Sequence, residues 1–287
     1  MKIFITGGNG QVAYELARLA EQKKHRVLAP PREVLDITNS TAVREAIEKF
    51  YPDVVINTAA YTKVDQAEKE SELALAVNCD GVKNIAIACA AIDRPLIHVS
   101  TDYVFNGESK KPYTETDKTD PLNRYGETKL KGEEAVRESC EQHLILRVSG
   151  VFGVHGVNFV KTILRLAKEK KELRIVADQF TCPTPAVSIA ETLLKLTTFS
   201  RFGTYHYCGD RAMSWYEFAV SIVEKAREFV ELNVEKIIPI SAADYPTAAK
   251  RPSYSVLDCS KLERLTPIRR ASLDKGLTDV IAALHSA

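Results

Sequence analysis

The sequence has few cysteines and no pair of them at a short spacing. Six cysteines are scattered through 287 residues, with no C-x-x-C pair and no Cys/His spacing of the kind that binds zinc. In a chain of this length, isolated cysteines are typical of small buried side chains in a reducing compartment. The sequence therefore argues against a disulfide framework, and we expect no metal site.

Long hydrophobic runs and a targeting segment are also lacking. The longest apolar run, Ile85–Ile92, is far shorter than the roughly 18 residues that a membrane span needs. The chain begins directly with Lys2-Ile3-Phe4-Ile5-Thr6, without a basic segment, a long apolar stretch or a cleavage site. We therefore expect a cytoplasmic protein that does not interact with a membrane.

Neither sign of charge is in excess. The chain has 39 basic and 38 acidic residues, which gives a formal net charge of +1. Such a balance argues against a surface built for nucleic acid, although it is compatible with a small basic pocket for a phosphorylated ligand. The composition, 45% apolar and 27% charged, is that of an ordinary globular protein with room for one large or two medium domains.

Short runs rich in Val, Ile and Leu alternate with helical patterns in the first half of the chain. Runs of this kind are typical of strands buried on both faces, and their alternation with helices implies right-handed crossovers and a parallel sheet. We predict an α/β protein with a doubly wound, Rossmann-type domain over residues 1–150. Residues 151–287 are predicted to form a smaller, mainly substrate-binding domain, with some segments returning to the sheet. The predicted strands are Ile3–Thr6, Arg26–Leu28, Val54–Asn57, Leu96–Ser100 and Leu144–Val148, and the predicted helices are Val12–Lys24, Thr41–Phe50, Glu72–Ala91, Asn123–Glu138, Phe159–Lys171, Val187–Thr197, Trp215–Phe229 and Ser272–Leu284.

A glycine-rich loop, Thr6–Ala13, follows the first strand directly and opens the first helix. Glycines in this place permit unusual backbone angles and let main-chain N–H groups approach a pyrophosphate at the helix N-terminus. A glycine pair after a strand is often only a turn, but its position at the first strand–helix junction favours dinucleotide binding. The predicted contacts in this loop are Gly7, Asn9, Gly10, Gln11 and Val12.

The second strand is followed by Pro30-Pro31-Arg32-Glu33, with no acid directly at its tip. An acid there would hold the ribose of NAD, whereas Arg32 could meet the 2′-phosphate of NADP. The sequence thus favours NADPH, with NADH as the alternative. Asp36 and Ile37 are further candidates for contact with the adenine. Arg32 is equally compatible with a solvated loop residue, and Asp36 with a turn or cap.

Tyr125 and Lys129 are spaced so that both side chains lie on one face of a helix. A free tyrosine has a pKa near 10, and a neighbouring ammonium would lower it toward the range useful for proton transfer. Most such pairs are surface residues. Here a helix start lies just upstream, and Thr101 follows the fourth strand, where ligands of open α/β sheets bind. Without the pair, Thr101 would be interpreted as a cap.

The glycine loop, Ser100-Thr101 and Tyr125-x-x-x-Lys129 together resemble the extended short-chain dehydrogenase/reductase family. Longer strings narrow the resemblance to the dTDP-4-dehydrorhamnose reductases, over nearly the whole chain. These strings are Asn57-Thr58-Ala59-Ala60-Tyr61-Thr62-Lys63-Val64-Asp65, Ser100-Thr101-Asp102-Tyr103-Val104-Phe105-Asn106-Gly107, Asp178-Gln179 with Pro183-Thr184, Ser214-Trp215-Tyr216-Glu217-Phe218-Ala219, and Arg251-Pro252.

The resemblance implies that NADPH delivers hydride to C4 of a dTDP-linked 4-keto-6-deoxy sugar. Tyr125 would protonate the developing alkoxide, Lys129 would lower the pKa of that tyrosine and hold the nicotinamide ribose, and Thr101 would bind the carbonyl oxygen. A homodimer is compatible with the family. The implied cofactor contacts also include Ala59, Ala60 and Tyr61, and the implied substrate contacts are Thr62, Val64, Thr101, Asp102, Tyr103, Asn158 and Arg251. A surface cap for Asn158 and a structural ion pair for Arg251 are the competing interpretations, and Trp215 is expected in the core of the smaller domain.

One position departs from the family. Gly150 stands where these reductases usually have tryptophan, beside the expected sugar, so another dTDP-keto sugar such as a dihydrostreptose precursor is an alternative substrate. Two further alternatives share the fold. One is a non-catalytic regulatory subunit of the methionine adenosyltransferase type, and the other is a nucleotide-sugar epimerase that retains NAD⁺.

Overall fold

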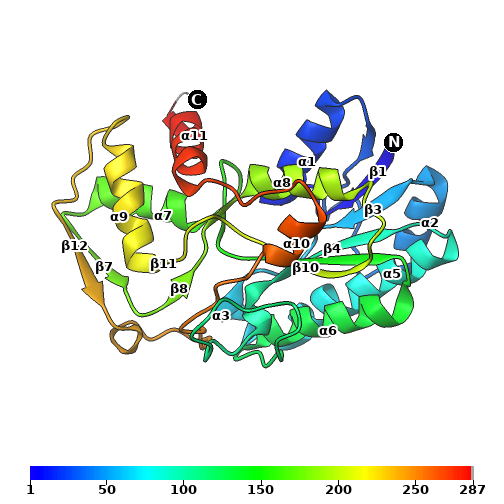
Figure 1. Cartoon of the computed structure of the whole chain (residues 1–287), viewed down its shortest axis with the longest axis horizontal. Helices are drawn as coiled ribbons and strands as arrows, with labels where there is room; N and C mark the ends of the chain where they lie inside the picture. The colour runs from blue at the N-terminus through cyan, green and yellow to red at the C-terminus, as the bar shows by residue number, and fades with distance from the viewer. Residues whose placement is uncertain (286–287) are drawn as a thin grey trace.

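A six-stranded parallel sheet forms the centre of the larger lobe in the computed structural model, which describes residues 1–285 (Figure 1). The strand order is β10-β5-β4-β3-β1-β2, and every neighbouring pair is parallel. The predicted doubly wound α/β fold is confirmed. The strands are β1 (Lys2–Thr6), β2 (Arg26–Leu28), β3 (Val54–Asn57), β4 (Leu96–Thr101), β5 (His143–Val148) and β10 (Gly203–Tyr207).

The chain reverses its direction across the sheet between β1 and β3. From β1 it first adds β2 on one side and then crosses to β3 on the other side. In open parallel sheets, ligands bind beyond the carboxyl ends of the strands at this kind of switch point. The loop after β1 and the loop after β3 therefore face each other where a ligand site is expected.

Helices cover both faces of this sheet. Along β1, Ile3 and Ile5 pack in one core with α1 (Gln11–Gln22) and α8 (Ala186–Leu196). Phe4 points the other way, because successive residues of a strand face opposite sides. Both faces of β1 are thus buried, as its continuous apolar sequence indicates. The helices on the second face are α2 (Ser40–Phe50), α5 (Gly81–Ala91) and α6 (Arg124–Ser139).

One long helical segment, residues 71–91, is interrupted by a π-helical turn. It consists of α4 (Ser71–Leu75), η1 (Ala76–Asp80) and α5. Within the described chain it is the helix long and apolar enough to cross a membrane by length and composition, and 50% of its most apolar window is buried. Val82, Ile85 and Cys89 on this segment are fully buried against the sheet. Its apolar character is thereby explained by the core.

The smaller lobe is built around a separate apolar core, on the left of Figure 1. Trp215 packs against Phe159 and Phe218, with ring centroids 4.7 and 6.4 Å away, which confirms that it anchors this core. The helices of this lobe are α7 (Phe159–Glu169), α9 (Trp215–Ala226) and α11 (Leu273–His285), and its paired strands are β7 (Glu172–Val176) with β12 (Lys236–Ile240) and β8 (Phe180–Thr181) with β11 (Met213–Ser214).

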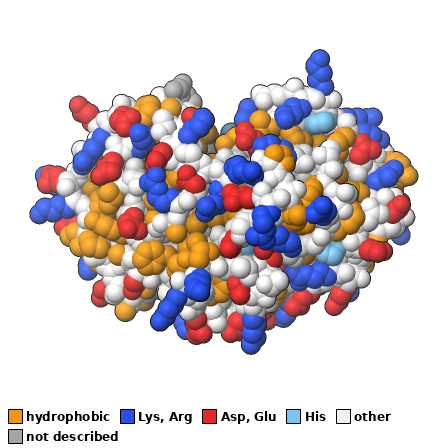
Figure 2. Space-filling model, viewed as in Figure 1, with side chains coloured by type: hydrophobic (Ala, Val, Ile, Leu, Met, Phe, Trp, Pro, Cys, Tyr) orange, Lys and Arg blue, Asp and Glu red, His pale blue; other side chains and the backbone are white. Residues whose placement is uncertain are grey.

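Two later segments return to the large lobe. Helix α8 packs beside α1, and β10 pairs with β5 as the outermost strand of the sheet. Between the lobes, β6 (Val151–Phe152) pairs with β9 (Thr184–Pro185). The remaining elements are α3 (Val64–Ala67), η2 (Asp102–Val104), η3 (Ala242–Asp244) and α10 (Ser260–Leu265). On the face shown in Figure 2, basic and acidic side chains are interspersed, in keeping with the balanced charge.

Candidate active site

The glycine loop is packed too closely for side chains. Gly7 has φ of +77°, and a Cβ atom there would lie 2.8 Å from the Ala59 main chain after β3. At Gly8 a Cβ atom would lie 2.2 Å from the Ala29 carbonyl oxygen after β2. The loop can therefore be built only with glycine at these two positions.

The N-terminus of α1 opens beside this loop. Gly10 precedes the helix and has no side chain with which to cap it, and the first turn holds no acid. Main-chain N–H groups and the positive end of the helix dipole are thus left for an anionic group. This arrangement fits the pyrophosphate of a dinucleotide.

Arg32 and Asp36 lie together beyond β2. The Arg32 Nη2 atom is 3.3 Å from Asp36 Oδ2, and the guanidinium side chain is 60% exposed, so it is accessible to a phosphate. The Thr38 main-chain N–H, assisted by the Thr38 hydroxyl and Arg32, lowers the pKa of Asp36. The Ile37 side chain, which was expected to contact the adenine, is instead buried against Gly81 in the core. On the other side of the loop, Asn9 donates a 3.4 Å hydrogen bond to Glu33.

Helix α6 brings Tyr125 to the end of β4. Asn123 caps the helix by accepting a 2.8 Å hydrogen bond from the Gly126 N–H. A Cβ atom on Gly126 would lie only 2.2 Å from the Tyr103 carbonyl oxygen, so glycine allows α6 to pack directly on η2. The Tyr125 ring lies edge-to-face with that of Tyr103, with ring centroids 5.9 Å apart, and Thr101 is near enough to the Tyr125 phenol to lower its pKa. The structure therefore brings together three residues that the sequence selected.

The electrostatics of Tyr125 differ from the expectation. Burial raises the pKa of its phenol to about 12, while Thr101 acts in the opposite direction. Lys129 does not counter this rise in the pKa of Tyr125, because its Nζ atom is directed to the Val99 carbonyl and to His98. Tyr125 is therefore protonated at neutral pH, as a proton donor must be.

Lys129 is almost fully buried, with 2% of its surface exposed. Its Nζ atom donates a 2.8 Å hydrogen bond to the Val99 carbonyl oxygen and lies 3.4 Å from Nε2 of His98. Burial lowers the pKa of Lys129 to about 8, although the Glu133 carboxylate one helical turn away favours the charged form.

Glu133 in turn holds an ion-pair network beneath the site. It accepts hydrogen bonds of 2.8 and 2.7 Å from Arg147 on β5, 2.7 Å from Arg137, and 2.6 Å from the Ser100 hydroxyl. Glu133 and Arg147 are both buried, and such pairs are stable only when further hydrogen bonds satisfy them. The network joins α6 to β4 and β5 and fixes the helix that carries Tyr125 and Lys129.

Asp102 is buried between the two lobes. The Thr101 and Ser149 hydroxyls donate to its carboxylate at 3.1 and 3.0 Å, and Ser149 is 2.7 Å from the Thr181 hydroxyl of β8. Burial raises the pKa of Asp102 to about 6, although hydrogen bonds from Ser255, Ser149 and Thr101 favour the carboxylate. In this structure the Thr101 hydroxyl proton is thus directed to Asp102.

The loop after β3 is held by a buried asparagine of the π-helical turn. Asn78 accepts a 2.8 Å hydrogen bond from the Tyr61 N–H and donates to the Tyr61 carbonyl at 3.1 Å and to the Thr128 hydroxyl at 3.1 Å. The Tyr61 hydroxyl donates to Glu70 at 2.7 Å, which raises the pKa of the phenol to about 12. Asn78 was missed by sequence reasoning. A polar residue inside an apolar helical run was the available signal.

The expected substrate residues lie in two places. Arg251 forms a bidentate pair with Asp65, at 2.7 and 3.1 Å, next to Val64 at the start of α3. Thr62 is exposed in the preceding loop. Asn158 lies elsewhere, because it caps α7 and donates a 2.8 Å hydrogen bond to Gln11 at the start of α1. The structure thus groups Arg251 with Val64 and places Asn158 beside the glycine loop.

Gly150 lies at the junction of the lobes with φ of +55°. A Cβ atom there would be 2.9 Å from Pro183 Cα and 3.0 Å from the Cys182 carbonyl oxygen. A tryptophan could not be placed on this backbone without moving residues 182–183. The glycine that replaces the usual tryptophan of the family is therefore required by the main-chain conformation at this position.

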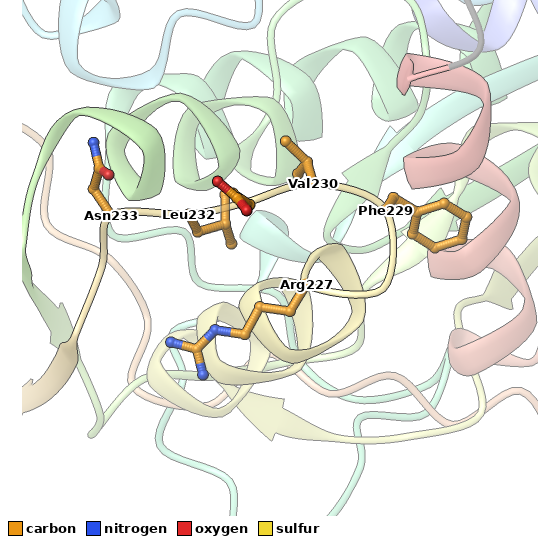
Figure 3. Close-up of a pocket in the computed structure, with 6 residues that line it drawn as sticks. Arg227, Phe229, Val230, Leu232 and Asn233 are labelled. Atoms are coloured by element: carbon orange, nitrogen blue, oxygen red, sulfur yellow. The ribbon is translucent and has the colours of Figure 1, made fainter.

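A hollow of about 560 Å³ lies away from all of these residues, in the turn between α9 and β12 (Figure 3). None of the candidate site residues lines it, and Arg227 there is hydrogen-bonded to the Val234 carbonyl. The lining residues of the hollow are Arg227, Phe229, Val230, Glu231, Leu232 and Asn233.

Among residues 1–285, no cluster of three or more His, Cys, Asp or Glu side chains could hold a metal ion.

A Rossmann-type sheet, a glycine loop at its switch point and a Thr–Tyr–Lys set beyond β4 define the class of short-chain dehydrogenases/reductases. The family described as the RmlD substrate binding domain matches residues 1–286, and the chain belongs to that family.

Known relatives agree with this assignment. The chain is 41% identical to a dTDP-4-dehydrorhamnose reductase of Aggregatibacter actinomycetemcomitans, over 98% of each chain. A crystal structure of a dTDP-4-dehydrorhamnose reductase from Clostridium acetobutylicum superposes with a TM-score of 0.94, at 39% identity and 99% coverage of both chains. A Bacillus anthracis dTDP-4-dehydrorhamnose reductase in complex with NADP has a TM-score of 0.93, at 36% identity, and covers 98% of this chain and 99% of its own.

Proposed function

We propose that this protein is an NADPH-dependent reductase that converts dTDP-4-dehydrorhamnose to dTDP-L-rhamnose by reducing the C4 ketone. The observation that carries the proposal is the meeting of Tyr125 on α6 with Thr101 at the end of β4, close enough for Thr101 to lower the pKa of the phenol, in a chain that matches dTDP-4-dehydrorhamnose reductases end to end. The exposed Arg32 supports NADPH as the cofactor, and a close structural relative is described in complex with NADP.

NADPH, when bound, supplies the hydride that adds to C4. The Thr101 hydroxyl donates to the carbonyl oxygen after it turns away from the Asp102 carboxylate, while its oxygen still accepts from the Tyr103 N–H. Tyr125 gives its phenolic proton to the C4 oxygen as negative charge develops there. Its raised pKa keeps the proton in place until an alkoxide, a much stronger base, forms. The products are the C4 alcohol and the tyrosinate, which must regain a proton before the next turnover.

We assign the two ends of the substrate to different contacts. Tyr103 and Val64 lie at the sugar end, and Arg251 lies toward the diphosphate, where its pairing with Asp65 holds the guanidinium in place. In this proposal the dTDP-sugar lies between the lobes and the cofactor lies over the switch point. The domain division at residue 150, the homodimer and the cytoplasmic location stay predictions.

The decisive experiment mixes the purified chain with NADPH and dTDP-4-dehydrorhamnose and follows absorbance of the reduced nicotinamide. Loss of absorbance with formation of dTDP-L-rhamnose supports the proposal. A panel of other dTDP-keto sugars, each with NADPH and NADH, tests the effect of Gly150. Absence of turnover with every sugar of the panel would contradict the reductase function.

A further inference from the structure

Lys129 faces a buried histidine that the mechanism above does not use. His98 lies on β4 and has no exposed surface, and its Nε2 atom is 3.4 Å from the Lys129 Nζ atom. The other ring nitrogen, Nδ1, is 2.9 Å from Nδ2 of Asn57 at the end of β3. The imidazole therefore connects the amide of Asn57 with the amine of Lys129.

Ala59, Asn57, His98 and Lys129 form a row of hydrogen-bonded groups. The direction of each hydrogen bond in this row is fixed by a main-chain N–H. The Ala59 N–H can only donate, and it lies 3.0 Å from Oδ1 of Asn57. The Thr6 hydroxyl donates to the same oxygen at 2.6 Å. The Asn57 side chain thus presents its Nδ2 group to His98, and this group is a donor. The Nδ1 atom of His98 must accept and carries no proton.

A neutral imidazole has one N–H group, which is then at Nε2 and points toward Lys129. An ammonium group has donors only, so in the charged form two donors face each other. A neutral amine has a lone pair and accepts the Nε2–H hydrogen bond. A charged imidazolium would face donors at both ends, and burial together with the charge of Lys129 holds the pKa of His98 well below its usual range.

We propose that His98 is a positioning residue for Lys129, held in the Nε2–H tautomer by Asn57, and that it makes the Lys129 ammonium a readier proton donor. The Val99 carbonyl orients Nζ in either protonation state, since both forms donate. The charged groups around the pair are Glu133 and Arg137 on α6 and Arg147 on β5, and they neutralise one another in part. For turnover, which rests on the proposed function, His98 would speed return of a proton to the site after Tyr125 has given up its own.

The row begins at the glycine loop. The Ala59 N–H lies where a Cβ atom on Gly7 would be only 2.8 Å away, so the loops after β1 and β3 are in tight contact. A shift of either loop would alter the Ala59–Asn57 hydrogen bond, which with that of Thr6 holds the Asn57 amide in the orientation that sets the tautomer of His98. The geometry thus joins the candidate cofactor loop to the protonation of Lys129 through three hydrogen bonds.

The first test reads the tautomer directly. In the full-length protein labelled with ¹⁵N-histidine, two-bond ¹H–¹⁵N correlation spectra identify which ring nitrogen carries the proton, and loss of one ring signal in His98→Gln assigns it. We expect the Nε2–H tautomer for His98 without titration between about pH 5.5 and 8.5, although a free imidazole titrates near 6.5. An Nδ1–H tautomer, or titration in that range, would overturn the proposal.

The second test reverses the direction of the hydrogen bond between residue 57 and His98. Asn57→Asp has the same shape but can only accept, so it should move the proton of His98 to Nδ1 and leave Nε2 as an acceptor for the ammonium. We expect the pKa of Lys129, followed by NMR of ¹³C-labelled lysine and assigned with Lys129→Met, to rise by roughly one unit or more. Asn233→Asp, which adds the same charge in the turn after α9, should change neither signal.

The outcomes separate the two contributions of Asn57→Asp. A reversed tautomer without a rise in the pKa of Lys129 would overturn the proposal, and so would a rise without reversal, because the added charge alone would then explain it. These spectra need neither cofactor nor sugar. A failure of the reductase assay is therefore distinguishable from a failure of this inference.

Discussion

At the scale of single residues, burial decides the chemistry of the site more than the local charge pattern does. Tyr125 and Lys129 are four residues apart on α6, yet Lys129 donates to the Val99 carbonyl and faces His98. Desolvation then raises the pKa of the tyrosine and lowers that of the lysine. Both shifts suit a site in which the Tyr125 phenol gives up a proton and the Lys129 ammonium then supplies another.

Tyr125→Phe should lower turnover by about 100-fold to 10,000-fold, because the variant has no proton for the C4 oxygen. NADPH binding should change little, since the aromatic ring and its contact with Tyr103 remain. Steady-state kinetics and cofactor titration by fluorescence measure the two effects. A variant with more than a tenth of the wild-type rate would remove Tyr125 from its assigned role.

Asp102→Asn should raise stability at neutral pH. The pKa of Asp102 is about 6 in the fold against 3.8 as the reference, so the folded state holds a proton that the unfolded state has released. The free energy of unfolding therefore falls as pH rises from about 4 to 6, and a shift of about two units corresponds to roughly 3 kcal/mol. Urea unfolding at pH 4 and pH 7 measures this. A stability difference between variant and wild type that does not grow over this interval would contradict the assignment.

At the scale of elements, two glycines let α6 approach its neighbours. Gly126 packs on the Tyr103 carbonyl of η2, and Gly132 lies where a Cβ atom would be 2.1 Å from the Asn78 carbonyl of η1. The helix that carries Tyr125 and Lys129 is thereby held against the π-helical turn that fixes the loop after β3. Helix propensity alone gives no sign of this requirement.

Gly132→Ala should destabilise the protein, even though alanine is favoured over glycine inside helices by about 1 kcal/mol. The added methyl group meets main-chain atoms that cannot move alone, and overpacking of this kind costs about 1–3 kcal/mol. Thermal unfolding is the measurement, with the exposed Glu138→Ala on the same helix as the control. Stabilisation of Gly132→Ala would show that η1 and α6 separate easily.

At the scale of the whole molecule, the site is assembled from both lobes. Asp102 reaches Ser149 and through it Thr181 of the smaller lobe, and Asp65 pairs with Arg251. The cofactor loops lie on the large lobe alone. Cofactor binding should therefore depend on residues of the large lobe, whereas substrate binding should depend on residues of both lobes.

Arg32→Ala should weaken NADPH binding while it leaves NADH binding nearly unchanged. The exposed guanidinium is expected to contact the 2′-phosphate, which only NADPH carries, and a charge-assisted hydrogen bond of this type contributes about 1.5–3 kcal/mol. The ratio of the two dissociation constants, measured by calorimetry, tests this. Equal losses for both cofactors would place Arg32 away from the phosphate.

Much of this architecture could be predicted from the sequence because it depends on local patterns. Alternating apolar runs and helical segments determined the parallel sheet, and the glycine loop and the Tyr125–Lys129 spacing identified the two halves of the site. The strand β10 was not predicted, since a short segment that joins a sheet from 55 residues beyond its neighbour has no local signal.

The tertiary structure alone decided which groups meet in the interior. It buried Tyr125 and Asp102, paired Arg251 with Asp65, and set His98 against Lys129. Proton affinities depend on desolvation and on partners contributed by distant segments, and neither is encoded in the spacing of residues along one helix. The sequence by itself thus determined the class of chemistry, and the fold determined the protonation states with which it is carried out.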